Sequence, residues 1–339
     1  MGLHSFVTPD ARHRDGPRGA DDRRQTQTRV LRRFIAACLI FLIIGPAVAE
    51  TVRIATFAAP LSRRGPGLLL RDILKSEEQV LQAAETIRAV DADIIVLTDF
   101  DFDHGGAALS AFAAMLDYQY AFAKQPNTGV PTELDIDGNG YLGDARDAQG
   151  YGRFEGDGGM AILSKLPVGE VTSFDHVLWR DVLDNHSTDP PELADIQRLS
   201  TTGHWIVPIA VEKTVLNILA FSATPPVFDG PDNRNDRRNA DEVLFWLKHL
   251  DIPHPIVAGN ANLDPNGGEG DRVAIAQLLT DPRLQDPLPD QTTADWPDGP
   301  GALRVSYVLP SSDLTVKSAG IERSDSGPHA LVWVDVEMP

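Results

Sequence analysis

Alternating and continuous runs of hydrophobic residues divide the first half of the chain into short strands and helices. Residues 52–57 alternate and are rich in strand formers, and residues 93–98 form a continuous apolar run, as in strands buried on both faces. Residues 77–90 place apolar side chains at helical spacing, and residues 106–116 form a second helix rich in alanine. This β-α-β-α opening predicts an α/β sheet with helices outside it.

The rhythm breaks at residues 124–158, where glycine, aspartate and asparagine indicate a long insertion over the surface. A helix is expected over 237–250, because its apolar residues form one stripe. Further strands are expected at 159–164, 205–211, 214–221, 255–259, 304–309 and 331–336. Repeats, coiled-coil heptads and a domain linker are not evident, which favours one domain over residues 50–339.

The N-terminal region has a different pattern. Residues 1–33 contain eight arginines and no lysine, residues 34–44 are an apolar run, and Ala47-Val48-Ala49 supplies small residues before Glu50. This layout is typical of a signal peptide, residues 1–49, cleaved after Ala49. The alternative is an uncleaved anchor, although the run is shorter than the roughly 20 residues that span a bilayer. The long polar leader favours a true start nearer Val30 or Leu31.

Cleavage would change the composition of the protein. It removes the single cysteine, Cys38, and changes the formal net charge from −19 to −23, because eight basic and four acidic residues leave. A chain without thiols suits an oxidising compartment, so we expect a secreted or periplasmic protein with no stable membrane association. Its negative charge repels polyanions, which makes naked nucleic acid an unfavourable partner. The oligomeric state cannot be predicted from the sequence.

Several motifs follow one another in a recognisable order. They are DIIVLTDFD, GMAILSKLPV, TPPVFDGPDNRNDRRNADE, VAGNANLDP, RVSYVLP and HALVWVDV, preceded by a first strand at 52–57. In this order the chain resembles the endonuclease/exonuclease/phosphatase superfamily, the DNase-I-like metal-dependent phosphoesterases, and within it a secreted bacterial branch. The resemblance covers about residues 51–338. It implies a four-layer α/β sandwich of two packed, mainly antiparallel or mixed sheets flanked by helices.

The resemblance also implies a site built on a divalent cation, Mg²⁺ or Mn²⁺, with a carboxylate base and donors for phosphate oxygens. This chain departs from that pattern at six positions. Ala58 stands where the family has an asparagine, Asp99 where it has the metal-binding glutamate, and Ser222 where a histidine contacts phosphate. Asn260 replaces the aspartate base, Ser306 an acidic residue, and Pro328 the aspartate before the last histidine. Asn262 and His329 match.

These replacements are mutually consistent, because a base and phosphate donors lose their role once the metal site weakens. An amide cannot accept a proton from water near neutral pH, and a positioned base contributes about 10²–10⁴ in rate. The alternative is a misplaced alignment, in which Asp264, Asp313 or Asp325 stands in for a lost carboxylate.

A second candidate site lies in the insertion. Asp135, Asp137 and Asn139 have the spacing of positions 1, 3 and 5 of a calcium loop, and Gly140 supplies position 6. Arg146 occupies position 12, where an EF-hand has glutamate, so Asp144 or Asp147 would have to complete a site. The alternative is a solvated acidic turn. Similarly, Arg234, Arg237 and Arg238 could hold a phosphate or carboxylate, or could pair with Asp232, Asp236 and Asp241.

Three functions therefore stay open. The leading hypothesis is an exported phosphoesterase-family pseudoenzyme that retains its cleft for binding a phosphate ester or other anion. The second is a working phosphodiesterase or phosphatase with a rebuilt site around Asp99, Asn262 and His329. The third is a calcium-stabilised secreted binding protein. The natural substrate is not determined by the sequence.

Overall fold

The computed structural model describes residues 51–228, 230 and 232–338. The predicted signal peptide, residues 1–49, lies outside the described residues. Residues 49–339 cluster as one compact unit. No helix in the described ranges combines the length and the apolar content needed to cross a membrane.

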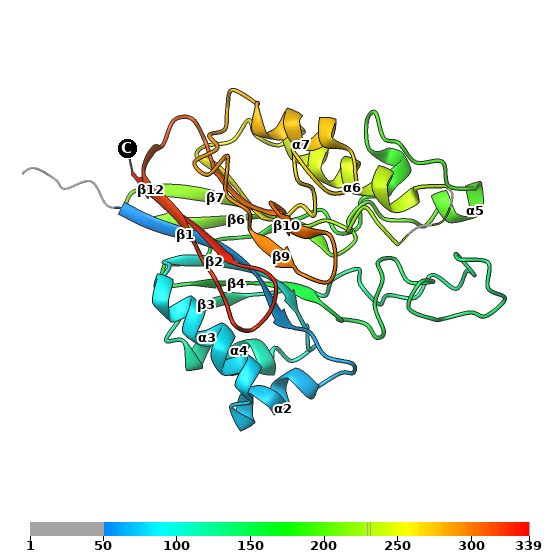
Figure 1. The fold of residues 1–339 in the computed structure, drawn as a ribbon, viewed down its shortest axis with the longest axis horizontal. Helices are drawn as coiled ribbons and strands as arrows, with labels where there is room; N and C mark the ends of the chain where they lie inside the picture. Colours follow the sequence, from blue (N-terminus) through cyan, green and yellow to red (C-terminus); the bar gives the residue numbers. More distant parts are fainter. Residues whose placement is uncertain (1–50, 229, 231, 339) are drawn as a thin grey trace, which may run out of the picture. The chain divides into compact units, whose positions relative to one another are not determined.

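Two sheets form the centre of this unit (Figure 1). The first has the strand order β12-β13-β1-β2-β4-β3, and the second has the order β11-β8-β7-β6-β5. Their strands are β1 (Thr51–Leu61), β2 (Ile94–Phe100), β3 (Tyr120–Phe122), β4 (Gly159–Ser164), β5 (Thr172–Ser173), β6 (Gly203–Val211), β7 (Thr214–Ser222), β8 (Pro255–Asn260), β11 (Ser306–Pro310), β12 (Thr315–Glu322) and β13 (Leu331–Glu337). A small hairpin joins β9 (Ala294–Trp296) to β10 (Gly301–Leu303).

Each sheet contains one parallel pair, and its remaining pairs are antiparallel. In the first sheet β1 and β2 run parallel, and in the second β7 and β8 do. Parallel neighbours need a crossover connection. The connections are made by α2 (Leu68–Lys75) with α3 (Glu78–Val90), and by α6 (Arg234–Leu244) with the 3₁₀ turn η2 (Phe245–Lys248). The predicted mixed, mainly antiparallel sheets are confirmed.

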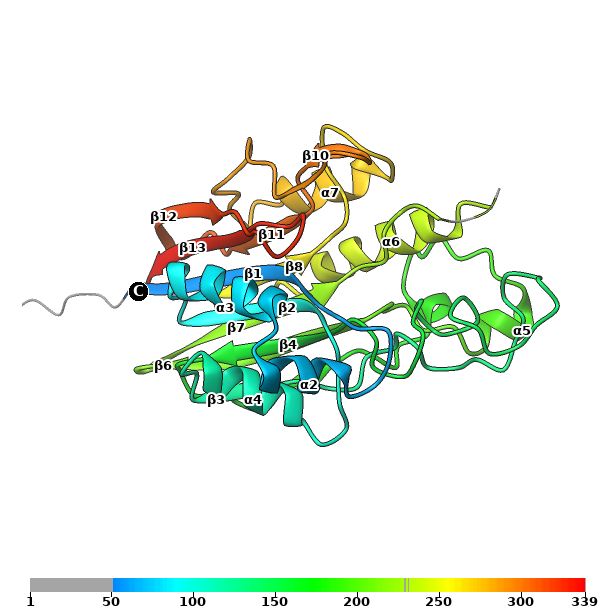
Figure 2. The same cartoon turned by 60° about the horizontal axis from the view of Figure 1, so that its bottom comes forward.

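Hydrophobic side chains alternate between two of the three cores of the sandwich. Along β2, Ile94 and Val96 belong to the core between the sheets, whereas Ile95 and Leu97 pack against the helices. This confirms that the 93–98 run is buried on both faces. The outer cores lie under α2, α3 and α4 (Ala107–Met115) on one side, and under α6, η2 and α7 (Arg272–Leu279) on the other. Figure 2 shows the two helical layers on opposite faces of the sheets.

The helix expected at 237–250 begins three residues earlier, at Arg234, and its last turn is the 3₁₀ segment that ends at Lys248. The first strand is longer than expected and continues past Ala58 to Leu61. Its pairing with β2 becomes irregular between Ala58 and Leu61. The strand β12 and the helices α2 and α7 were not predicted. The helical turns η1 (Trp179–Asp181) and α5 (Pro191–Ala194) interrupt the long connection before β6.

Candidate functional site

Three predicted site residues lie side by side at the ends of neighbouring strands. In the register of the second sheet, Asn260 of β8 faces Ser222 of β7 on one side and Ser306 of β11 on the other. All three are buried. The Ser306 hydroxyl has no hydrogen-bond partner within the described chain. The structure therefore places three of the six replaced positions together, and none of the three side chains is ionisable.

Gly259 allows the close strand approach just before Asn260. Its φ is +154°, and a Cβ atom there would lie 1.9 Å from the carbonyl oxygen of Phe221 on β7. Any larger residue would push β7 and β8 apart at the point where Ser222 and Asn260 meet. This close approach explains why residue 259 in the VAGN sequence is a glycine.

Asn262 does not continue the strand pattern of Asn260. It has a left-handed φ of +54°, and its backbone N–H and that of Ala261 both donate to the carbonyl oxygen of Val305. The Asn260 Oδ1 accepts from the Asn262 N–H at 3.2 Å, and the Asn262 Nδ2 donates to the Ala223 carbonyl at 2.9 Å. Asn262 lies beyond the strand, which ends at Asn260.

Two buried side chains of α6 hold the loops that follow β7 and β8. The Asn239 Nδ2 donates to the carbonyl oxygens of Thr224 (2.5 Å) and Ala261 (2.8 Å). The Glu242 carboxylate accepts from the backbone N–H groups of Thr224 (2.7 Å) and Thr201 (2.5 Å). Burial raises the pKa of Glu242 to about 7. Sequence reasoning missed both residues, although polar residues three apart on an otherwise buried helix face are a usable signal.

His329 is linked to the ends of these strands through the segment 293–296. It forms an isolated bridge with Ala294, and its ring lies edge-on to Trp296 with centroids 5.1 Å apart. Burial lowers its pKa to about 4, so the ring is neutral at pH 7, and its Nδ1 has no partner within the described chain. Thr293 links the segment to β11. Its hydroxyl oxygen accepts from the Ser306 N–H (3.0 Å), and its carbonyl oxygen accepts from the Ala330 N–H (2.8 Å).

Asp99 lies near other acidic residues at the end of β2. It lies at an irregularity between Thr98 and Phe100 and has a left-handed φ of +62°. Burial raises its pKa to about 6, an effect opposed by the Ser62 hydroxyl. Burial also raises the pKa of Asp101 to about 7, although this carboxylate accepts from the backbone N–H groups of Gly158 (3.0 Å) and Arg63 (2.8 Å). Within the part of the chain that the structure describes, Asp99 makes no hydrogen bond or ion pair with Asn260, Asn262 or His329.

A Mg²⁺ or Mn²⁺ ion needs several oxygen ligands in a regular arrangement. At the positions that the resemblance implies, Asp99 is the one carboxylate, because Ala58, Ser222, Asn260, Ser306 and Pro328 offer no charged ligand. The substitute carboxylates considered from the sequence are also engaged elsewhere. Asp264 accepts three backbone N–H groups, including that of Arg304, and Asp313 pairs with His254. Asp325 is exposed. At the positions that the resemblance implies, the side chains present do not supply a set of ligands for a divalent cation.

In the acidic loop of the insertion, by contrast, several carboxylates lie close together. Asp135, Asp137 and Asp147 bring ligand oxygens within 4.8 Å of one another, and they form the one such group found in the described ranges. Asp147 is buried and accepts from the N–H groups of Ile136 (2.8 Å) and Gly143 (3.0 Å). The Asn139 side chain bonds Asp144 and the Tyr141 N–H. Of the two residues considered for completing the loop, Asp147 joins the group and Asp144 does not.

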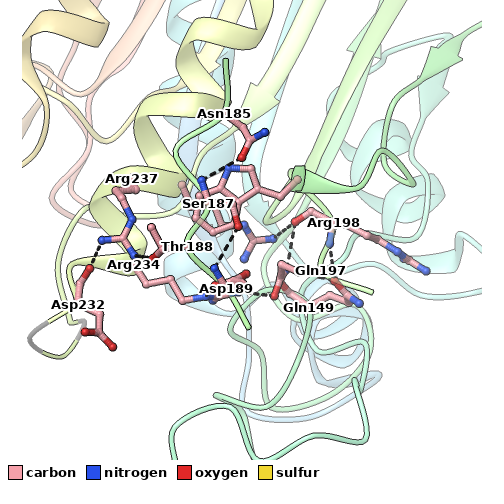
Figure 3. Close-up of polar contacts among 12 residues, drawn as sticks. Gln149, Asn185, Ser187, Thr188, Asp189, Gln197, Arg198, Asp232, Arg234 and Arg237 are labelled. Atoms are coloured by element: carbon pink, nitrogen blue, oxygen red, sulfur yellow. Dashed lines mark hydrogen bonds and ion pairs between the residues drawn. The ribbon is translucent and has the colours of Figure 1, made fainter. Parts of the chain in front are cut away.

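The arginines of α6 hold neighbouring segments (Figure 3). The Arg234 guanidinium pairs bidentately with Asp189 at 2.7 and 3.0 Å, and Arg237 donates to the Thr188 hydroxyl at 2.7 Å. Arg238 is buried and donates to the carbonyl oxygens of residues 198–200, and burial lowers its pKa to about 10. Arg234 thus has a structural ion pair, but its partner is Asp189 rather than Asp232, Asp236 or Asp241.

Comparisons with known proteins agree with this architecture. A sequence model described as the Endonuclease/Exonuclease/phosphatase family matches residues 65–326. No curated protein sequence matches the chain. Among solved structures, similarity extends to an endonuclease/exonuclease/phosphatase from Beutenbergia cavernae, with 15% identity, a TM-score of 0.57, and coverage of 85% of this chain and 72% of that one.

Two further solved structures are similar to this chain over nearly their whole length. A family protein from Leptotrichia buccalis has 14% identity and a TM-score of 0.52, with coverage of 85% of this chain and 100% of that one. A family protein from Bacteroides thetaiotaomicron has 11% identity and a TM-score of 0.52, with coverage of 86% and 99%. At these identities the likeness concerns the fold.

Proposed function

Because the chain belongs to the endonuclease/exonuclease/phosphatase family, we propose that it is a member with an impaired phosphoesterase site that keeps its cleft for binding a phosphate ester or a similar anion. One observation carries the proposal: Ser222, Asn260 and Ser306 meet in register where the resemblance implies a histidine and two carboxylates. The scaffold around them is intact, since Asn239 and Glu242 hold the adjoining loops.

The chemical consequence follows from the groups that are present. Asn260 cannot activate water, and Asp99 is the one carboxylate at the metal-binding positions that the resemblance implies. A site with few carboxylates repels an anionic ligand less than a site with many. It can therefore accept an anion without a bound metal ion to neutralise its own negative charge. Neutral donors such as the Asn260 amide and the Ser222 hydroxyl would then contact its oxygens. Binding without turnover is the function that this arrangement supports best.

The decisive experiment is an activity assay on residues 50–339 with Mg²⁺ or Mn²⁺, using bis(p-nitrophenyl) phosphate and p-nitrophenyl phosphate. We expect no metal-dependent hydrolysis. The matched positive control restores the family residues at all six positions, with Ala58→Asn, Asp99→Glu, Ser222→His, Asn260→Asp, Ser306→Asp and Pro328→Asp. Wild-type turnover that disappears in Asp99→Ala or His329→Ala would instead establish the working enzyme with a rebuilt site.

Export is part of the proposal and rests on the N-terminal sequence. The apolar run 34–44 with Ala47-Val48-Ala49 supports cleavage and release as a secreted or periplasmic protein. The N-terminal residue of the mature protein, determined by Edman degradation or mass spectrometry, tests this directly. We expect Glu50. An intact residue 1–49 segment on the purified, membrane-bound protein would contradict export by cleavage.

The convergence of Asp135, Asp137 and Asp147 favours a second role, in which calcium stabilises the insertion. The nearest cation to Asp137 is Arg146, at 3.7 Å with a mostly exposed side chain, which compensates three carboxylates only weakly. Ca²⁺ accepts flexible sets of oxygen ligands, so carboxylates held by backbone N–H groups suit it better than Mg²⁺.

A further inference from the structure

A cavity that includes none of the predicted site residues lies between α6 and the segment 182–189. This segment is fixed to the helix at three points: His186 bonds Asp241, Thr188 accepts from Arg237, and Asp189 pairs with Arg234. Figure 3 shows Ser187, Thr188 and Asp189 beside Arg234 and Arg237. The cavity between the segment and the helix has a volume of about 280 Å³.

The polar centre of this cavity is the pair His186 and Asp241. The Asp241 side chain is 2% exposed, and its Oδ2 accepts from the Trp179 Nε1–H (2.5 Å) and the His186 backbone N–H (2.6 Å). Its Oδ1 lies 2.6 Å from the His186 Nδ1. Because an ionised carboxylate only accepts hydrogen bonds, the Nδ1 of the neutral ring carries the hydrogen, and Nε2 presents a lone pair. Nε2 has no hydrogen-bond partner in the described part of the chain.

The remaining walls are mainly apolar. The aliphatic and aromatic side chains that line the cavity are Val182, Leu183, Leu244, Phe245 and Leu247. Lys248 also lines it, but its ammonium group donates to the Leu183 carbonyl and lies 3.8 Å from the Asp184 carboxylate. Besides Lys248 and the exposed carboxylate of Asp184, the neutral polar groups that line the cavity are the imidazole of His186 and the exposed amide of Gln277.

We propose that this cavity binds a small single-ring molecule that carries one weakly acidic hydroxyl, a phenol. The hydroxyl donates to the His186 Nε2, while the ring packs against Leu244 and Phe245. Binding pockets for small molecules commonly combine apolar walls with one or two placed polar groups, and a volume near 300 Å³ suits one ring. A carboxylate ligand fits less well, because Asp184 and Asp241 are close and Lys248 is already engaged.

The buried carboxylate fixes the orientation of the ring, because the Asp241 Oδ1 lies 2.6 Å from the His186 Nδ1 and leaves Nε2 as the acceptor. A phenol hydroxyl is a better hydrogen-bond donor than an ordinary alcohol and therefore suits this acceptor. The chain offers an internal comparison in His254, whose Nδ1 lies 2.8 Å from Asp313. There the carboxylate is 54% exposed, and His254 does not line this cavity.

The test measures binding of p-nitrophenol to the purified protein by the change in its absorbance, with nitrobenzene as a probe that lacks the hydroxyl. We expect saturable binding of p-nitrophenol and at least about tenfold weaker binding of nitrobenzene. His186→Ala should weaken p-nitrophenol binding by about tenfold or more, and His254→Ala should leave it unchanged. Circular dichroism establishes that each variant is folded.

Gln277→Trp provides an independent variant, because residue 277 is exposed on α7 and a larger side chain there narrows the cavity without touching the pair. We expect it to reduce binding as well. Absence of saturable binding by the wild type, equal binding of nitrobenzene, or unchanged affinity in both His186→Ala and Gln277→Trp would overturn the proposal. If His186→Ala does not fold, the Gln277→Trp result decides.

Discussion

At the scale of single residues, the structure explains how Asn260 can replace a carboxylate without loosening the loop. Its Oδ1 still accepts from the Asn262 N–H, as a carboxylate oxygen would. The amide therefore preserves the turn and removes the charge. The neighbouring Ser306 is also neutral, so no carboxylate remains beside Asn260 in the strand register.

His204 provides a residue-scale prediction of pH dependence. It is fully buried, its Nε2 donates to the Glu242 carbonyl (2.9 Å), and its Nδ1 accepts from the Ser200 hydroxyl (2.7 Å). Burial lowers its pKa from 6.5 to about 4. Below pH 6.5 the unfolded chain binds a proton that the folded protein does not, so stability is present above this pH and is lost as pH falls toward 4.

We therefore expect the free energy of unfolding to fall by about 2 kcal/mol more in the wild type than in His204→Gln between about pH 7 and about pH 5. Urea denaturation at the two pH values measures the difference. The variant starts from a lower stability, and the comparison concerns only its dependence on pH. Equal losses in both proteins would show that His204 is not the titrating group.

At the scale of elements, α6 organises two different regions with two of its faces. Asn239 and Glu242 hold the loops after β7 and β8, and Arg234, Arg237 and Asp241 hold the segment 182–189. The helix is therefore rich in polar residues that are buried rather than solvated. The sequence pattern placed the start of this helix at residue 237 instead of Arg234, because the first turn contains no apolar residue.

The insertion loop gives a prediction at the same scale. Addition of Ca²⁺ should raise the melting temperature of the wild type, because an ion that binds only the folded loop stabilises it by mass action. Asp137→Ala should abolish the rise, and Asp298→Ala, which removes an exposed acid outside the loop, should not. Differential scanning fluorimetry with Ca²⁺, Mg²⁺ and chelator measures the shifts. A rise that persists in Asp137→Ala would place the ion elsewhere.

At the scale of the whole molecule, the four layers place the two parallel strand pairs in separate sheets that share one core. The long connections 123–158 and 174–202 extend from the same end of the sheets in Figure 1. Loops carry much of the functional variation of a scaffold, because they tolerate change without disturbing the core. This explains how a family fold persists at 15% identity or less to solved relatives.

Charge leads to a prediction for the whole molecule. With a formal net charge of −19 for the full chain, the protein should not bind naked duplex DNA at physiological salt in the absence of divalent cations. Fluorescence anisotropy of a labelled duplex measures this, with a basic DNA-binding protein as the control. Binding that weakens as salt increases would reveal a cationic surface that the net charge conceals.

The periodicity of the sequence determined most strands of this protein and its α/β class, because burial on one or both faces of a strand leaves a periodic trace in the chain. The arrangement in four layers was implied by the resemblance to a known family. Runs such as 93–98 and 159–164 carry that trace. It missed β12, α2 and α7, whose exposed or short apolar patterns resemble those of loops. It also named Ser222, Asn260 and Ser306 separately, from the resemblance.

Only the tertiary structure decided which of these residues meet. Strand register brought Ser222, Asn260 and Ser306 together, and the irregularity in β2 left Asp99 among other acids. The pair His186 and Asp241, separated by 55 positions, had no trace in the sequence at all. Contacts of this kind depend on how distant segments pack, and local periodicity contains no information about packing between segments.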